Sequence, residues 1–226
     1  MTTTQIEKIL ELINKNDIIN AKQLLQIELL KNSNNKNVKL IDVIKKYFNK
    51  MDNSRPVLKT IMIKNNKQFI CNGYSMYIFE SYIDELDILP QSTDNVLDYT
   101  QIIIKGANYQ NIDNYDLKIL KNINKIVNYY KQIDGIDKKG QFIIPFANKF
   151  YDAKMILELV NIYQNNFDNL KMYKTNDPLQ LTQLTNNNIT SIIMPVRIVN
   201  DDEKKLYNDR INSIFSLLED YHEQNN

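Results

Sequence analysis

Near the C-terminal end, three short segments alternate apolar and polar residues, and only brief turns separate them. The segments are NLKMYKT at 169–175, LQLTQLT at 179–185 and TSIIMPVRI at 190–198, joined by NDP and NNN. A period of two is the pattern of a half-buried strand, and turns this short join antiparallel neighbours. The chain is therefore expected to build an antiparallel sheet at this end.

Residues 1–51 show the period of an α-helix. Apolar residues recur three and four positions apart in TQIEKILELINK at 4–15, in NDIINAKQLLQIELLK at 16–31 and in VKLIDVIKKYFNKM at 38–51. This spacing places them on one side of an α-helix. Because the first two segments are adjacent, we expect a helical hairpin followed by a third amphipathic helix.

Short-range signals mark where several elements begin or turn. Thr4 followed by Glu7 fits a capping box at the start of the first helix. The pair Asn65–Asn66 can adopt positive φ, which predicts a tight hairpin turn. Asp113 or Asn114 is expected to cap a long helix in the middle of the chain.

Residues 57–199 contain strand-like and helix-like segments in a repeating order. The expected elements are strands within 57–81, a strand at the end of an acidic loop at 82–104, a helix at 111–132, a strand at 141–147 and a helix at 148–163, before the three strands described above. This order amounts to two copies of a strand–helix–strands unit in which short hairpins dominate. The sequence thus predicts the α+β class with mainly antiparallel sheet.

The expected domain organisation has three parts. Residues 1–35 form the helical hairpin, residues 36–200 form one domain, and residues 201–226 form an amphipathic helix. The last segment begins with three acidic residues, which stabilise a helix N-terminus through the helix dipole.

A scarcity of reactive side chains excludes several kinds of active site. Cys71 is the only cysteine and His222 the only histidine, so a histidine-based triad or a Cys/His zinc site has almost nothing to draw on. Four glycines are too few for a phosphate loop or a dinucleotide fingerprint. Asp84, Glu85 and Asp87 resemble a metal cluster, but an exposed loop explains them better. We therefore expect a protein that is not an enzyme and needs no cofactor or metal.

The termini and the hydropathy pattern indicate a cytoplasmic protein. The start MTTTQIEKIL lacks the basic-then-apolar pattern of a signal peptide. No apolar run approaches the roughly 18 residues that a membrane span needs. A single cysteine allows no disulfide within the chain, as is usual inside cells.

The net charge of +1 hides basic and acidic blocks. Residues 36–67 carry nine Lys and Arg against two Asp, whereas residues 68–115 carry one Lys against seven acids. Residues 116–174 carry ten Lys against six acids, and residues 201–226 carry three basic groups against seven acids. Such blocks concentrate an electrostatic field locally. A solvated surface accounts for them equally well.

Several motifs together resemble one family. In chain order, KFYDAKMILELVNIY, DNLKMYKT and PLQLTQLTNNNITSIIMPVRI are similar to the last half-domain of the bacterial DNA polymerase III beta sliding clamp. The segment MPVRI at 194–198 resembles that family's Met-Pro-Met-Arg-Leu ending. Upstream, NGYSM at 72–76 stands where the family has Asp-Gly-His-Arg-Leu. The resemblance spans about one clamp domain, and residues 1–50 and 201–226 have no counterpart in it.

The resemblance implies topological closure around double-stranded DNA rather than bond chemistry. It also implies a basic inner wall and an apolar pocket for a short apolar-acidic peptide of a replication or transcription protein. The implied pocket residues are Gly73, Tyr74, Met76, Met194, Pro195, Val196 and Arg197. The candidate DNA-facing residues are Lys45, Lys46, Lys118, Lys121 and Lys125. Tyr74 and Ser75 depart from the family's His and Arg, so part of the pocket is chemically altered.

A chain with one clamp domain would need a head-to-tail homo-oligomer, or mixed assembly with another clamp, to close a ring. In one copy we expect Gly73 and Met194 to lie apart, so that a neighbouring copy completes the pocket. The expected function is that of a phage or mobile-element processivity or docking factor in replication or transcription.

The alternative is a clamp-fold decoy, inhibitor or adaptor. Such a protein would bind a host replication, transcription or defence protein through its added helices, without encircling DNA. In either case, the acidic helix that starts at Asp201 can fold back over the pocket, or it can serve as simple packing or as an oligomer contact.

Overall fold

A computed structural model describes residues 2–33, 35, 37–51, 54–94, 96–104, 108–132, 142–173, 177 and 180–223. The chain forms two compact units. The N-terminal unit comprises Met1–Ile70 and Ser81–Leu97, and the C-terminal unit comprises Cys71–Glu80 and Asp98–Asn226. The expected boundaries near residues 35 and 200 stay a prediction.

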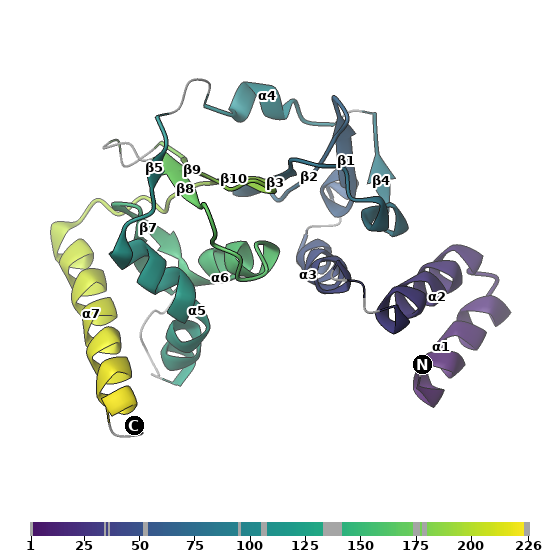
Figure 1. Cartoon of the computed structure of the whole chain (residues 1–226), viewed down its shortest axis with the longest axis horizontal. Helices are drawn as coiled ribbons and strands as arrows, with labels where there is room; N and C mark the ends of the chain where they lie inside the picture. Colours follow the sequence, from purple (N-terminus) through teal and green to yellow (C-terminus); the bar gives the residue numbers. More distant parts are fainter. Residues whose placement is uncertain are drawn as a thin grey trace. The chain divides into compact units, whose positions relative to one another are not determined.

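The N-terminal unit combines three helices with a small sheet. Its elements are α1 (Thr3–Asn14), α2 (Ile18–Asn32), α3 (Val38–Asn49), the 3-10 helix η1 (Pro56–Lys59), β1 (Ile61–Lys64), β2 (Lys67–Cys71), the 3-10 helix η2 (Asp84–Ile88) and β4 (Gln91–Ser92). The strands lie in the order β4-β1-β2, with β1 antiparallel to β2 and parallel to β4. The expected hairpin and third helix are confirmed (Figure 1).

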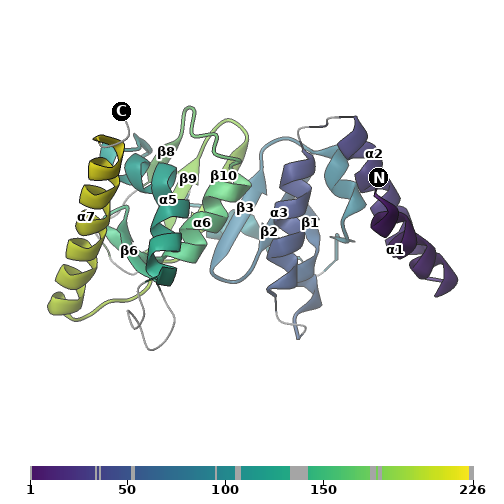
Figure 2. The same ribbon diagram turned by 90° about the horizontal axis from the view of Figure 1, so that it is seen from below.

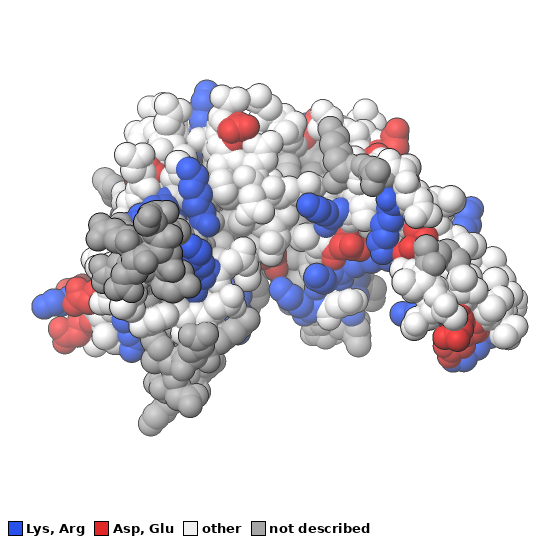
Figure 3. Space-filling view, turned by 60° about the horizontal axis from the view of Figure 1, so that its bottom comes forward, with Lys and Arg blue, Asp and Glu red and all other residues white. Residues whose placement is uncertain are grey.

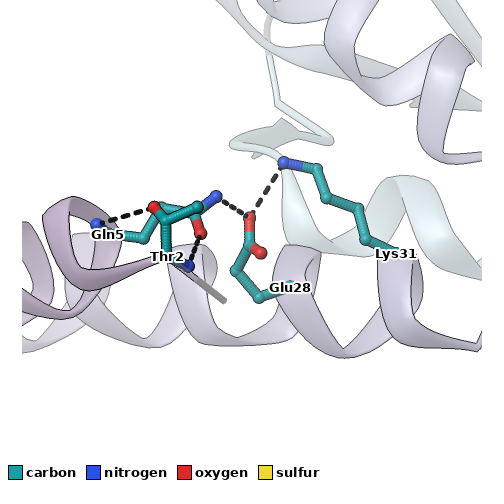
Figure 4. A network of polar contacts seen from close by, with 4 residues as sticks. All are labelled: Thr2, Gln5, Glu28 and Lys31. Carbon is teal, nitrogen blue, oxygen red and sulfur yellow. Dashed lines mark hydrogen bonds and ion pairs between the residues drawn. The ribbon is translucent and has the colours of Figure 1, made fainter.

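Of the turn and the helix cap predicted in this unit, the turn is confirmed and the cap is shifted. Asn65 and Asn66 adopt φ of 51° and 61°, as expected for the tight turn between β1 and β2. The predicted position of the capping box is wrong by two residues, because Thr2 and Gln5 form it in place of Thr4 and Glu7 (Figure 4). The helix starts earlier because Thr2 accepts the N–H of Gln5 while the Gln5 side chain accepts the N–H of Thr2.

The C-terminal unit places helices around a second set of strands. Its elements are β3 (Ser75–Phe79), α4 (Tyr99–Ile102), β5 (Gln110–Asn111), α5 (Asn114–Gln132), β6 (Ile143–Phe146), β7 (Lys149–Asp152), α6 (Ala153–Ile162), β8 (Lys171–Tyr173), β9 (Thr182–Thr185), β10 (Ile189–Ile193) and α7 (Asp201–Glu223). Strands β3-β10-β9-β8-β5 are antiparallel neighbours, and β6 and β7 form a separate hairpin. The predicted α+β class with mainly antiparallel sheet is confirmed.

Two predicted elements of this unit are wrong. A strand was expected at the end of the segment 82–104, but Tyr99–Ile102 is helical because Asp98 accepts the N–H of Thr100 and caps a turn there. The helix expected from 148 to 163 begins only at Ala153. Its first residues form β7, since Ala147 and Asn148 adopt positive φ and turn the chain back along β6.

The core of the C-terminal unit lies between its sheet and its helices. Helix α6 contacts α5, and α5 contacts α7, so the three helices lie side by side (Figure 2). Tyr163 at the end of α6 donates its hydroxyl proton to backbone carbonyls of Leu184 and Ile189. The buried apolar residues that join these layers are Ile119, Ile123, Ile126, Ile156, Leu159, Met172, Leu184 and Ile193.

Candidate partner-binding pocket

A tight turn before β3 fixes the first side of the pocket. The side-chain oxygen of Asn72 accepts the N–H groups of Tyr74, at 2.8 Å, and of Ser75, at 2.7 Å. The N–H of Asn72 donates to the carbonyl of Ser75 at 3.0 Å. Gly73 adopts φ of 90°, a conformation that other residues rarely take. The turn leaves the Tyr74 side chain 68% exposed.

Pairing of β10 with β3 supplies the second side. Ile192 is the register partner of Met76, and Ile193 is the partner of Ser75. One residue further on, the N–H of Met194 donates to the carbonyl of Tyr74 at 2.9 Å. Met194 therefore lies beside Gly73 and Tyr74 in a single chain. The expectation that a neighbouring copy is needed to bring them together is wrong.

These residues line a shallow apolar hollow of about 100 Å³. Ile102 of α4 and Leu181, just before β9, border the hollow on one face of the sheet. Helix α6 covers the other face of the sheet (Figure 1). Glu158 of α6 accepts the hydroxyl proton of Ser75, which faces away from Met76 along β3. The residues around the hollow are Cys71, Gly73, Tyr74, Ser75, Met76, Ile102, Leu181, Ile192 and Met194.

Sulfur-containing side chains give the hollow an adaptable surface. Met76 forms its buried floor and Met194, which is 46% exposed, forms part of its rim. Unbranched thioethers repack readily around different ligands. Cys71 is buried, and burial raises the pKa of its thiol, so it is a poor nucleophile. The described lining of the hollow is suited to accept an apolar side chain.

The other predicted pocket residues leave the hollow. Pro195 and Val196 are half-buried and Arg197 is exposed, and none of them lines it. The N–H of Val196 donates to the carbonyl of Phe150 at 2.7 Å, which draws the chain toward β7. The structure thus brings Gly73, Tyr74, Met76 and Met194 together without the following three residues. Sequence reasoning missed Ile102 and Leu181, because nothing in the local pattern places them over β3.

The described part of the C-terminal helix lies away from the hollow. Asn200 caps α7 by accepting the N–H of Asp202, and the acidic first turn follows as expected. Helix α7 contacts β6 and α5, with Phe215 packed edge-to-face on Tyr115 at 6.0 Å between ring centroids. Among the described residues, no side chain of α7 lines the hollow. Of the alternatives for this helix, its described residues favour simple packing over a fold-back onto the pocket.

The three lysines predicted on α5 have different surroundings. Lys118 places its ammonium 4.3 Å from the centroid of the Phe215 ring, so α7 partly covers it. Lys121 and Lys125 are exposed. On the face seen in Figure 3, basic side chains stand in small groups with neutral surface between them. Contact between these lysines and DNA stays a prediction.

The two predicted lysines of α3 also differ. Lys46 is exposed, whereas Lys45 is half-buried and burial lowers the pKa of its ammonium group. Neighbouring Asp42 opposes that shift. Lys45 is therefore less available to a phosphate than Lys46.

Two of the three acidic residues of η2 have partners within the protein. The carboxylate of Glu85 accepts hydrogen bonds from the amides of Asn35 and Asn37. Asp87 accepts the hydroxyl proton of Tyr82 at 2.7 Å and the amide of Gln91 at 2.6 Å. No group of three or more His, Cys, Asp or Glu side chains suited to a metal occurs in the described ranges. Within the same residues, the helices are too short or too polar to cross a membrane.

Comparison with known proteins gives one structural similarity. No model of a known protein family matches the chain, and no curated protein does. The fold is similar to the crystal structure of the beta subunit from DNA polymerase of Streptococcus pyogenes, with a TM-score of 0.46 and 11% sequence identity. The match covers 71% of this chain and 63% of that chain.

Proposed function

We propose that the protein is a non-enzymatic interaction protein that captures a short apolar segment of a client protein at the Gly73–Met194 hollow. The observation that supports it is the Met194–Tyr74 backbone hydrogen bond, which joins the two predicted motifs in one chain. A pocket that one chain completes needs no ring. The adaptor hypothesis is therefore favoured over encirclement of DNA, and the clients would be replication, transcription or defence proteins.

The chemistry of the hollow sets the expected ligand. Met76, Ile192 and Leu181 offer no hydrogen-bonding group, so they select a bulky apolar side chain. Burial of one such side chain contributes about 1.5–3 kcal/mol. By itself this corresponds to a dissociation constant of roughly 5–100 mM, so the other contacts of a peptide must supply most of any micromolar affinity.

Fluorescence anisotropy with a labelled peptide containing Leu-Phe and a neighbouring Asp tests the proposal. Met194→Glu places a charge on the rim and should weaken binding about tenfold or more. Leu217→Glu is the matched control, because Leu217 on α7 is 48% exposed and Met194 is 46% exposed. Binding that is unchanged in Met194→Glu, or equally reduced in both variants, would contradict the proposed site.

The second candidate function is a DNA processivity factor that assembles head to tail around DNA. The exposed side chains of Lys121 and Lys125 on α5 favour it. If both lysines meet phosphates, their replacement should reduce the salt dependence of DNA binding by about 2 in the logarithmic slope.

The test compares Lys121→Glu/Lys125→Glu with Lys171→Glu/Lys205→Glu, two exposed lysines on other elements. Retention on nicked circular DNA, with release after linearisation, would support encirclement. Equal affinity for both DNA forms, with equal effects of the two double variants, would rule it out.

A further inference from the structure

Met194 differs from the other described methionines in its exposure to solvent. The chain has seven methionines, and the structure describes all but Met1. Met194 is 46% exposed. The other described methionines are less accessible, namely Met62, Met76 and Met172, which are buried, and Met51 and Met155, which are half-buried. Oxidation of a side-chain sulfur by a small oxidant in water depends on access to that sulfur, so Met194 should react first within this set.

Backbone contacts on both sides hold Met194 at the rim of the hollow. Its N–H donates to the carbonyl of Tyr74 at 2.9 Å, and the N–H of Val196 donates to the carbonyl of Phe150 at 2.7 Å. Pro195, which lies between the two donors, has a fixed φ. Because the backbone is fixed, the Met194 side chain stays where it both lines the hollow and meets solvent.

The other sulfur groups of the hollow are shielded from an oxidant. Met76 on the floor is 3% exposed and Cys71 is 5% exposed. Burial also raises the pKa of the Cys71 thiol, and the thiolate is the form that a peroxide oxidises. Oxidation at a low dose should therefore change the rim of the hollow and leave its floor intact.

We propose that Met194 is a site of reversible oxidation to methionine sulfoxide by hydrogen peroxide, and that this modification releases a client from the hollow. The release rests on the proposed peptide-binding function, whereas the modification itself does not. In the reaction the O–O bond of the peroxide breaks, one oxygen atom forms a bond to the Met194 sulfur, and the other leaves as water. The sulfur loses the two electrons that the peroxide gains. A methionine sulfoxide reductase restores the thioether with a pair of thiols, which becomes a disulfide while the oxygen leaves as water.

Oxidation changes the rim of the hollow from apolar to polar. A sulfoxide oxygen is a good hydrogen-bond acceptor, whereas a thioether sulfur is a weak one. The side chains of Met76, Ile192 and Leu181 offer no donor to it. A bound apolar side chain would displace water from the sulfoxide without replacing the lost hydrogen bond. We therefore expect oxidation of Met194 to raise the dissociation constant about 3- to 30-fold.

Mass spectrometry of proteolytic peptides, after treatment of the full chain with increasing hydrogen peroxide, tests the modification. In the folded chain Met194 should gain an oxygen atom at a lower dose than Met51 or Met155. In urea, where all three are exposed, they should react at similar rates. Oxidation of Met51 or Met155 as fast as Met194 in the folded chain overturns the proposal, whether or not a peptide binds.

Fluorescence anisotropy with the labelled peptide that contains Leu-Phe and a neighbouring Asp then tests the release. The dissociation constant of the native chain should rise after oxidation and return after treatment with a methionine sulfoxide reductase and thiol. Far-UV circular dichroism confirms that the oxidised chain is folded.

Two variants assign the effect on peptide binding to one sulfur. Met194→Leu has no sulfur at the rim, so its dissociation constant, whatever its starting value, should be the same before and after peroxide. Met155→Leu is the matched control, because Met155 lies on α6 at the other face of the sheet, and it should keep the full response. An unchanged constant in the oxidised native chain, or an equal rise in Met194→Leu, overturns the release. If the untreated chain binds no peptide, the proposed function and the release both fail, while the mass spectra still decide whether Met194 is the oxidised site.

Discussion

Replacement of Phe215 by Ala should detach the C-terminal helix while leaving the hollow intact. Phe215 is 5% exposed, packs on Tyr115 and lies under the Lys118 ammonium. Phe→Ala in a packed core costs about 3–5 kcal/mol. Because α7 docks on α5 and β6, this loss should fall on the helix and its support. Peptide binding at Met194 should be unchanged at urea concentrations where the unit stays folded.

The contribution of the ring itself can be separated from its volume. Phe215→Leu keeps most of the buried area but removes the edge-to-face contact, at about 0.5–1.5 kcal/mol, and the cation–π contact, at about 0.5–1 kcal/mol. Its cost should therefore be about 1–2.5 kcal/mol, well below that of Ala. A double-mutant cycle of Phe215→Leu with Lys118→Met should give a coupling of about 0.5–1 kcal/mol.

Urea denaturation of the full chain measures these differences, and hydrogen exchange locates them. Leu217→Ala serves as the control, because that side chain is 48% exposed on the same helix and should cost less than about 1 kcal/mol. If Phe215→Ala costs no more than Leu217→Ala, α7 is not docked through this ring. If deletion of residues 201–226 raises peptide affinity, the helix covers the hollow after all.

Three further predictions concern single groups. Burial raises the pKa of Tyr130 from 10 to about 12, so between these pH values the folded state keeps a proton that the unfolded state loses. The contribution of Tyr130 to stability is therefore full below pH 10 and falls between pH 10 and 12. Tyr130→Phe should flatten this fall when alkaline denaturation is measured. Ala147 holds φ of 52°, so Ala147→Gly should raise the free energy of unfolding by up to about 1 kcal/mol, and a lower midpoint in urea would contradict this. Gly73→Ala meets no atom within 4 Å but must adopt φ of 90°, so it should cost about 1–2 kcal/mol through the backbone alone; an unchanged thermal midpoint would show that the turn relaxes.

The elements with strong periodicity could be predicted from the sequence, because the apolar residues that repeat at helical or strand spacing are the residues that the element buries. Helix α3 buries Leu40, Ile41 and Ile44 at helical spacing. The turn at Asn65–Asn66 was predictable because its chemistry is local. Local residue preferences were misleading at the end of the segment 82–104. Its β-branched residues favour a strand, but Asp98 accepts hydrogen bonds from both the N–H and the hydroxyl of Thr100, and a helix starts there instead.

The hollow could be predicted only in part, since it depends on contacts between distant segments. NGYSM and the first residue of MPVRI meet at the hollow, and their pairing follows from the register of β3 with β10, which the sequence does not state. Ile102 and Leu181 belong to segments whose own patterns give no sign of a pocket. The separation expected between Gly73 and Met194 was wrong for the same reason.

The position of Pro195 explains why the hollow stays open at its rim. Strand β10 ends at Ile193, and Met194 makes the last backbone hydrogen bond to the β3 side of the sheet. Pro195 has no N–H to continue the ladder, so the chain leaves the sheet at that residue. Val196 then donates to Phe150, and the segment runs toward α7 beside β7. Met194 is thus held by its backbone at the end of a strand while its side chain remains exposed, an arrangement that suits a rim that adapts to a bound side chain.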